Sequence, residues 1–335
     1  MRRQVLRGFL GGMVVAALVL PVELWAAPFY EGKILRIVVG SRPGGGYDRM
    51  SRLLAKYLPK YIPGKPTIIV ENIPGAASLI VANNLYNLYK PDGLTIGTFN
   101  QGLPFAQILK AKGVRFDIAK YEWIGSTSRE ASLFTVRSDL PIRSVNDLKK
   151  IKDPMPVGSS GPENQNYQFS VLLKEYAGLN FKMITYPSAT EALLNLERKE
   201  TDGQAGTYSS LTPYIKRGLI RPLIRGRISA LGIENLPVDE DLTTDKRGKI
   251  IMALRSAADT NARPFVAPPR TPPGKMKIIR DAFARTVKDP DFLVEAERSS
   301  MMIEFTPAAE SLKIIKFIIN QPEEIIREFG KHIAY

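Results

Sequence analysis

Apolar residues recur along the chain at two spacings, and the first third of the sequence alternates between them. A β-branched run at 34–39 predicts a buried strand, and apolar positions spaced i, i+3, i+4, i+7 and i+8 predict an amphipathic helix at 48–58. A strand at 67–71, a helix at 78–89 and a strand at 94–99 follow. Because strands joined by such helices pair in parallel through right-handed crossovers, this third predicts an α/β unit.

The rest of the chain predicts a second α/β unit and a helical end. The expected strands of the second unit are 133–136, 156–159, 181–186 and 203–207, and its expected helices are 144–150, 165–177 and 190–198. A polar, charge-rich excursion at 235–249 precedes a strand at 263–267 and two helices, 275–287 and 308–330. Two such units followed by helices favour an α/β protein of two lobes joined by crossover segments.

Three loops rich in glycine and serine follow predicted strands, at residues 44–46, 75–76 and 159–161. Ligands of open α/β sheets bind at the carboxyl ends of the strands, so we expect these loops to face one site. Glycine lets the main chain approach a ligand closely, and the N–H groups at a helix start favour an anion. Asp48 has two interpretations: it stabilises the first helical turn, or it orients a water or a ligand hydroxyl.

The N-terminus has the layout of a secretory signal peptide. Arg2, Arg3 and Arg7 precede an apolar stretch at 9–20, and small residues follow. This stretch is too short to span a bilayer comfortably. We expect residues 1–27 to be removed on export and the mature protein to be periplasmic.

Composition removes several classes of chemistry. The chain has no cysteine and one histidine, His332, which excludes thiolate sites and disfavours catalytic triads and most transition-metal sites. Gly46 is followed by Tyr47 rather than by the lysine of a phosphate-binding loop, and Arg49 stands where a dinucleotide fingerprint has its third glycine. The net charge of +14 comes from scattered Lys and Arg, so nucleic acid is not an expected partner. We expect no catalytic residue, no metal and no cofactor.

Short motifs occur along the mature chain in a specific order. They are Pro43-Gly44-Gly45-Gly46-Tyr47-Asp48 with Arg52-Leu53-Leu54, Val70-Glu71-Asn72-Ile73-Pro74-Gly75-Ala76, Pro91-Asp92-Gly93, Gly158-Ser159-Ser160-Gly161, Tyr186 with Ala192-Leu193 and Asp202, and Ala267-Pro268-Pro269 with Asp289-Pro290. In this order and spacing, the chain resembles the extracytoplasmic solute receptors of tripartite tricarboxylate transporters, the Bug family. The resemblance covers almost the whole mature chain and is poor at 226–262.

The resemblance implies a two-lobed, periplasmic-binding-protein-like fold of type II with the ligand cleft between the lobes. Lobe 1 would comprise residues 28–132 and 258–335, and lobe 2 residues 133–257. The protein would capture a small organic carboxylate and deliver it to the membrane subunits of a transporter. It would act as a monomer and would not be an enzyme.

The resemblance also implies which residues bind the ligand. Two loops of lobe 1 would hold one carboxylate through main-chain N–H groups and ordered waters, and lobe 2 would close over it. The candidates are Arg42, Gly45, Gly46, Tyr47 and Asp48 in the first loop, Gly75, Ala76 and Ala77 in the second, and Ser160, Gly161, Asn164, Tyr186, Gly206 and Thr207 in lobe 2. Arg42 is either a partner of an anionic solute or a solvated residue at the rim.

Two alternatives stay open at this point. A sensor subunit would bind the same class of ligand and pass the bound state to a signalling partner. A secreted hydrolase would need a nucleophile with a base, and without a usable histidine that base would have to be a lysine or a carboxylate. The sequence also leaves open which carboxylate is bound and which membrane partner receives it.

Overall fold

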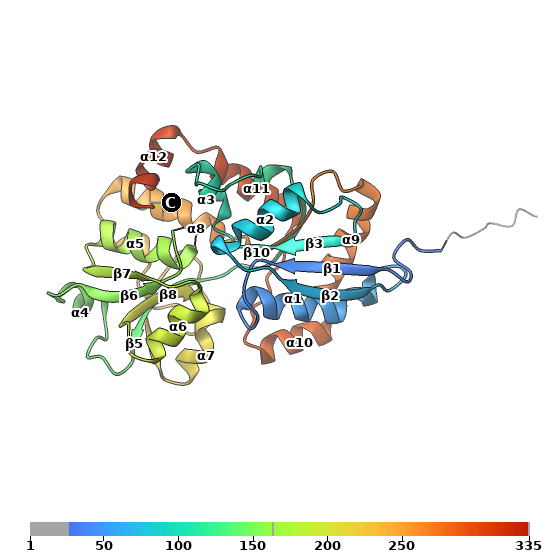
Figure 1. The fold of residues 1–335 in the computed structure, drawn as a ribbon. Coiled ribbons are helices and arrows are strands. Elements are labelled where there is room, and N and C mark those ends of the chain that lie inside the picture. Colours follow the sequence, from blue (N-terminus) through green and yellow to red (C-terminus); the bar gives the residue numbers. More distant parts are fainter. Residues whose placement is uncertain (1–26, 163, 334–335) are drawn as a thin grey trace, which may run out of the picture.

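The structure is a computed structural model that describes residues 27–162 and 164–333. Two β-sheets, each flanked by helices, lie side by side and form two lobes (Figure 1). The predicted signal peptide falls outside the described residues, apart from Ala27. Within them, we find no helix with the length and apolar character needed to cross a bilayer.

The first sheet has six strands in the order β11-β4-β10-β3-β1-β2. They are β1 (Ile34–Val39), β2 (Thr67–Asn72), β3 (Thr95–Thr98), β4 (Glu122–Ser128), β10 (Ala262–Ala267) and β11 (Thr306–Pro307). β1 is parallel to β2 and β3, which confirms the predicted crossovers. β10 returns from far along the chain and lies antiparallel between β3 and β4.

The segments before β4 and after β10 also form helices, most of which cover this sheet with their apolar faces, whereas the last of them packs against the second lobe. They are α1 (Gly46–Tyr57), α2 (Leu79–Asn87), α3 (Leu103–Ile108), α9 (Pro273–Thr286), α10 (Pro290–Arg298), α11 (Ala308–Ile319) and α12 (Glu323–His332), with the short 3₁₀ helices η1 (Leu58–Tyr61), η2 (Ala76–Ser78) and η3 (Ile118–Lys120). In α1, the predicted apolar residues Met50, Leu53 and Leu54 are buried, whereas Lys56 is exposed on the opposite face.

The second sheet has five strands in the order β7-β6-β8-β5-β9. Its elements are β5 (Ser132–Arg137), β6 (Met155–Ser159), β7 (Phe181–Thr185), β8 (Gly203–Thr207) and β9 (Ile220–Arg225), with helices α4 (Val145–Lys149), α5 (Gln165–Ala177), α6 (Ala189–Glu197), α7 (Tyr208–Lys216) and α8 (Lys246–Asp259) and the 3₁₀ helix η4 (Asp239–Leu242). β6 is parallel to β7 and β8, and β5 is antiparallel to β8 and β9. Each sheet is thus mixed: β10 and β11 run against the other strands of the first sheet, and β5 runs against those of the second.

Several predictions at the element level need correction. The single helix expected at 308–330 is two helices, α11 and α12, because Pro322 lies at the break and cannot donate the hydrogen bond that a continuous helix requires. The strands β4 and β9 and the helices α3, α7 and α10 were not predicted. The excursion expected at 235–249 contains η4 and the start of α8.

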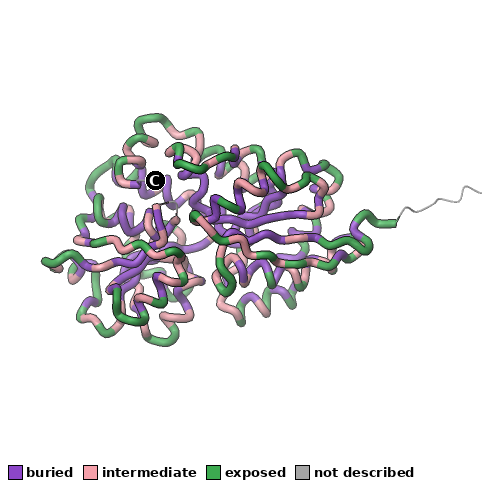
Figure 2. The backbone as a smooth tube through the Cα atoms, in the orientation of Figure 1, coloured by how far each residue is buried: buried purple, intermediate pink, exposed green. Residues whose placement is uncertain are grey.

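Buried segments, purple in Figure 2, run through both lobes, and apolar side chains of these segments form the cores. Around the first sheet, Ile37, Leu54 and Phe283 belong to one buried cluster. The cluster around the second sheet includes Phe134 and Phe169, and it also takes in Phe105 of α3 and Phe329 of α12. The rings of Phe105 and Phe329 lie 5.0 Å apart, so the C-terminal helix packs near α3 over the second sheet. The lobe boundaries implied by the resemblance remain a prediction.

Two crossovers join the sheets, at residues 129–131 and 226–261. A buried ion pair connects them, since Arg263 at the start of β10 contacts Glu130 in the first crossover. The N–H of Glu130 also donates to the carbonyl of Asp259 at the end of α8, at 2.9 Å. The link between the lobes is therefore a polar, fully buried junction.

Candidate functional site

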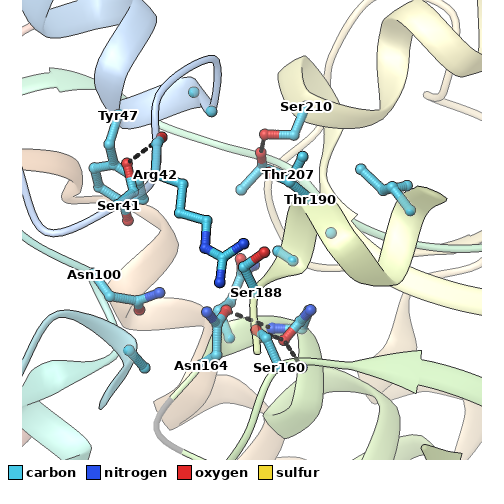
Figure 3. A pocket seen from close by; sticks show the side chains of 18 of the residues that line it. Ser41, Arg42, Tyr47, Asn100, Ser160, Asn164, Ser188, Thr190, Thr207 and Ser210 are labelled. Carbon is cyan, nitrogen blue, oxygen red and sulfur yellow. Dashed lines mark hydrogen bonds between the residues drawn. The ribbon is translucent and has the colours of Figure 1, made fainter. Parts of the chain in front are cut away.

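A cavity of about 710 Å³ lies between the lobes, where the carboxyl ends of β1 and β8 approach one another. Loops of both lobes line it, and Figure 3 shows side chains from both entering the same space. The strand ends that the sequence singled out are thus brought together. We call residues 40–46 the first loop and residues 73–78 the second loop.

The first loop presents main chain to the cavity. Gly44 has a φ of 84°, a left-handed conformation that favours glycine, and lets the chain turn into α1. Gly45 is the residue before α1, and no side chain caps the first helical turn. The N–H groups at this helix start therefore remain available to a ligand beside Gly45 and Gly46, which both line the cavity.

Asp48 holds the first loop in place from behind. Its carboxylate accepts hydrogen bonds from the N–H of Gly44 at 2.8 Å and from Nδ2 of Asn72 at 2.9 Å, and it pairs with Arg52 at 2.9 Å. Burial alone would raise the pKa of Asp48, but the hydrogen bonds from Arg52, Gly44 and Asn72 together hold it below its usual value. Asp48 is 2% exposed and does not line the cavity, which favours a structural role, here in fixing the first loop, over contact with a ligand.

The second loop has a strained backbone. Four consecutive residues, Gly75, Ala76, Ala77 and Ser78, have φ values of 144°, 42°, 47° and 80°. Left-handed conformations are unfavourable for residues other than glycine and concentrate at functional sites. Successive N–H groups in such turns form a concave surface that attracts anions. Ser78 joins the two loops, because its hydroxyl donates to the carbonyl of Gly40 at 2.9 Å.

The wall from the second lobe consists mainly of hydroxyl and amide side chains. Ser160 donates to Oδ1 of Asn166 at 3.1 Å, and Thr207 bonds to the hydroxyl of Ser210 at 2.8 Å (Figure 3). These residues lie at the starts of α5 and α7, and Ser188 lies at the start of α6. Each helix start carries roughly half a positive charge.

The electrostatics of the cavity favour an anion. The starts of α1, α5, α6 and α7 supply lining residues. Among the described lining residues, three are arginines and none is an Asp or Glu. Tyr47 remains protonated, because burial raises its pKa to about 12. Its oxygen accepts the N–H of Gln101 at 3.0 Å, so the hydroxyl proton can be donated elsewhere.

Arg42 spans the cavity. Its side chain leaves the first loop and extends toward Ser188 and Asn164 (Figure 3), and its guanidinium pairs with Glu191 in the first turn of α6. The two interpretations offered from the sequence were a solute partner and a solvated rim residue. The structure gives Arg42 a protein partner on the opposite lobe, so the pair connects the lobes, and contact of Arg42 with a solute stays a prediction.

Most of the predicted site residues line this cavity. They are Arg42, Gly45, Gly46, Tyr47, Gly75, Ala76, Ala77, Ser160, Asn164, Gly206 and Thr207. Three predicted residues are not among the lining residues: Asp48, Gly161 and Tyr186. Gly161 is buried in the turn before α5, with a φ of 104°, and Tyr186 immediately precedes the lining residues Pro187 and Ser188.

Several lining residues were missed from the sequence. They are Arg49, Asn100, Gln101, Gln165, Asn166, Ser188, Thr190, Gln204, Ser210, Tyr214 and Arg263, together with smaller neighbours in the same loops. Arg263 left a usable signal, since it is a lone charge in the otherwise apolar strand β10. Polar residues at the ends of β3 and β8 follow the same rule as the glycine loops and could have been included.

Metal binding finds no support in the described part of the chain. Within it, no group of three or more His, Cys, Asp or Glu residues is placed to hold an ion. His332 lies on α12, away from the cavity, where its ring packs edge-on against Tyr176 with 5.1 Å between centroids.

Comparison with known proteins finds relatives that are similar along most of this chain. A curated relative, described as a UPF0065 protein in the TAR-I ttuE-ttuC' intergenic region of Agrobacterium vitis, is 21% identical over 87% of this chain and 89% of its own length. The solved structure of the periplasmic binding protein BugD is 19% identical, covers 90% of this chain and 98% of its own, and has a TM-score of 0.73.

Two structures of proteins with bound ligands are also similar. Rpa4515 of R. palustris with adipate is 19% identical over 89% of this chain and 97% of its own, with a TM-score of 0.74. MatC of Rhodopseudomonas palustris with bound malate is 15% identical over 90% and 99%, with a TM-score of 0.71. At these identities the likeness concerns the fold, and it confirms the two-lobed, periplasmic-binding-protein-like architecture of type II.

The family itself follows from a sequence match over most of the chain. Residues 51–331 match the profile of the tripartite tricarboxylate transporter family receptor, TctC. The match covers most of the cavity lining and every strand of both sheets except β1, although the first loop lies before it. The resemblance noted from the motifs is thereby confirmed, and the chain belongs to the receptor family of tripartite tricarboxylate transporters.

Proposed function

We propose that this chain is an exported, periplasmic solute-binding protein that captures a small organic carboxylate between its lobes and delivers it to a tripartite tricarboxylate transporter. The bound carboxylate contacts the main-chain N–H groups of the first and second loops, and the second lobe closes over it. The closed form then presents the surface that the membrane subunits recognise. The receptor acts as a monomer and releases its ligand unchanged.

The observation that carries this proposal is the form of the two loops. Gly45 and Gly46 lie at a helix start without a side-chain cap, and Gly75, Ala76 and Ala77 hold a left-handed turn beside it. Two sets of free N–H groups can each supply charge-assisted hydrogen bonds of about 1.5–3 kcal/mol. Together they support micromolar binding, about −8 kcal/mol, without a charged side chain.

The comparisons and the lining residues support the same class of ligand. The similar structures of Rpa4515 and MatC hold adipate and malate, which are both carboxylates. The described lining offers no Cys, His, Lys, Asp or Glu that could act as a nucleophile's base, which supports binding without turnover.

A thermal-shift screen of the mature protein against organic acids tests the proposal. A ligand that binds only the native state stabilises it by about 2.7 kcal/mol when its concentration is a hundredfold above Kd. We expect several small carboxylates, and not their amides, to raise Tm, and we expect each stabilising acid to be recovered unchanged. A panel without any stabilising carboxylate would contradict the proposal, and so would turnover of one.

The variant Gly75→Asp tests the second loop. Gly75 has a φ of 144°, and a Cβ at this position would lie 2.4 Å from Cδ1 of Ile80. The substitution therefore distorts the turn and adds a negative charge to the cavity, and we expect ligand affinity to fall by roughly a hundredfold or more, measured by calorimetry.

Gly113→Asp is the matched control. Gly113 also has a positive φ, 97°, but it has open space around it and does not line the cavity. This variant makes the same change of charge and should keep wild-type affinity. Equal affinity in the two variants would argue against the loop as the carboxylate site.

A further inference from the structure

The three arginines that line the cavity differ in their partners. Arg42 pairs with Glu191, and Arg263 pairs with Glu130. Arg49, on α1, forms no ion pair with any residue that the structure describes. Its one side-chain hydrogen bond runs from Nη1 to the carbonyl of Ser299, at 3.2 Å. The charge of Arg49 is thus the uncompensated one among the lining arginines.

Two buried guanidinium nitrogens at this place lack a hydrogen-bond acceptor among the described residues. Nε of Arg49 and Nε of Arg263 are both buried, and neither has a hydrogen-bond partner among residues 27–162 and 164–333. Leaving a buried donor without an acceptor is costly, more so for a charged group. A ligand that offers acceptor atoms at this place would remove that cost.

The two guanidinium groups also act on each other. Burial and the charge of Arg49 lower the pKa of Arg263 to about 10, although the Tyr47 phenol opposes this shift. Tyr214 of α7 lines the same cavity, and the charge of Arg49 counteracts the increase in the Tyr214 pKa that burial and Glu197 cause. Glu130 compensates the charge of Arg263, so the charge of Arg49 is the local excess at this end of a cavity whose described lining has no Asp or Glu.

We infer that Arg49, with Arg263 behind it, forms a second anion subsite between α1 and α7, which makes Arg49 a residue that determines specificity. The subsite would take the second anionic group of a ligand whose first carboxylate lies on the two loops. This inference rests on the proposed function, because it requires the first carboxylate to be there. The chain would then prefer a ligand with two anionic groups over a matched ligand with one.

Calorimetry with matched acids tests the subsite. The probes are adipate against hexanoate and succinate against butyrate, which differ within each pair by one carboxylate. We expect wild-type protein to bind the better dicarboxylate at least tenfold more tightly than its partner. In Arg49→Gln, affinity for that dicarboxylate should fall by roughly tenfold to a hundredfold, the range expected for one charge-assisted contact, while affinity for the monocarboxylate stays within about twofold.

Two further variants make the result specific. Lys56→Gln removes the same charge from the exposed face of α1, outside the cavity, and should leave both affinities unchanged. Arg49→Lys keeps the charge but loses the planar fork, so it should restore part of the dicarboxylate preference, and it provides the test if Arg49→Gln does not fold.

The outcomes separate the inference from the proposed function. Equal binding of mono- and dicarboxylates by wild type, or an equal loss of both in Arg49→Gln, overturns the subsite but leaves the proposed function, because a carboxylate still binds. If no acid of either kind binds to wild type, whereas the protein is folded, both the proposed function and the subsite fail.

Discussion

The two walls of the cavity are built from different chemistry. The wall from the first sheet is mostly main chain, carried by glycine and alanine in the first and second loops, whereas the wall from the second sheet is mostly hydroxyl and amide side chains at the starts of α5, α6 and α7. Main-chain N–H groups recognise any carboxylate, because every residue supplies one. Side chains recognise what else the ligand carries. In the proposed function, the main chain of the first wall would hold the carboxylate, and the side chains of the second wall, with Arg49, would select among ligands.

Among the variants that compare the two walls, the largest effect is expected where the walls meet. A Cβ at Gly46 would lie 2.9 Å from Nη2 of Arg263 and 3.3 Å from Oγ of Ser210 on the other lobe. Gly46→Ala should therefore hold the lobes apart and weaken ligand binding by roughly tenfold or more, with little loss of unfolding free energy, because overpacking at an interface can be relieved by opening it. Calorimetry and small-angle scattering of the ligand-saturated protein measure both effects.

Gly45→Ala is the neighbouring control for this prediction. A Cβ at Gly45 would make ordinary contacts, 3.5 Å from the carbonyl oxygen of Arg42 and 3.8 Å from Oγ of Ser41. Gly45 also has an extended backbone that alanine adopts readily, with φ of −72° and ψ of 167°. Near wild-type binding is expected, and a loss equal to that of Gly46→Ala would show that the loop itself, not the meeting of the lobes, is sensitive.

A smaller loss of ligand affinity is expected from a change at Asp48, which supports the first loop from the side away from the cavity. In Asp48→Asn, one side-chain oxygen becomes an NH₂ group that faces the donors of Asn72, Arg52 and Gly44. We expect the free energy of unfolding to fall by about 1–2 kcal/mol and ligand affinity to fall by about fivefold, as the loop loosens. Urea unfolding and calorimetry measure these changes.

The pH dependence of this variant gives a further check. The native pKa of Asp48 is depressed, so the ionised carboxylate stabilises the fold above the pKa of the unfolded chain, about 4, and this contribution disappears as pH falls through the native value. The stability difference between wild type and Asp48→Asn should be constant from pH 8 to about pH 5 and should shrink below about pH 4. A difference that grows on acidification would contradict the assigned role.

The smallest change in ligand affinity is expected from a substitution on the second wall. Thr207→Val keeps the shape of the side chain and removes a hydroxyl that bonds to Ser210. Ligand affinity should change by about twofold to threefold, because one neutral hydrogen bond is worth about 0.5–1.5 kcal/mol. The change should differ between acids that carry a hydroxyl group and acids that do not. The control is Thr212→Val on α7, which removes a hydroxyl that does not line the cavity. It should not change the ranking of the acids by affinity. A uniform loss for every acid would place Thr207 in carboxylate recognition instead.

The same contrast explains what could be predicted from the sequence. The first wall depends on local signals in the sequence: a β-branched strand, then glycines, then a helical pattern. These signals alone predict that Gly45, Gly46 and Gly75 lie near one edge of the sheet. The strand β1 and the helix α5 have the bounds that were predicted. Local chemistry also explains the one misplaced helix, because the consequence of Pro322 is visible in the sequence.

Contacts between distant segments could not be predicted in this way. The partner of Arg42 is Glu191, and that of Arg263 is Glu130; each pair joins residues more than a hundred positions apart, from different lobes or crossovers. Strand β4 was missed because its sequence, EWIGSTS, has small polar residues where an alternating apolar pattern is expected, although it is almost wholly buried. The polar residues of the second wall were missed for the same reason, since only the fold brings them to the cavity.

A crystal structure of the mature protein with a stabilising carboxylate tests the central claim most directly. We predict that one carboxylate of the ligand lies within hydrogen-bonding distance of main-chain N–H groups in both loops, next to Gly46 and Ala76, directly or through one ordered water. A carboxylate bound elsewhere in the cavity, with these N–H groups turned away from it, would contradict the claim.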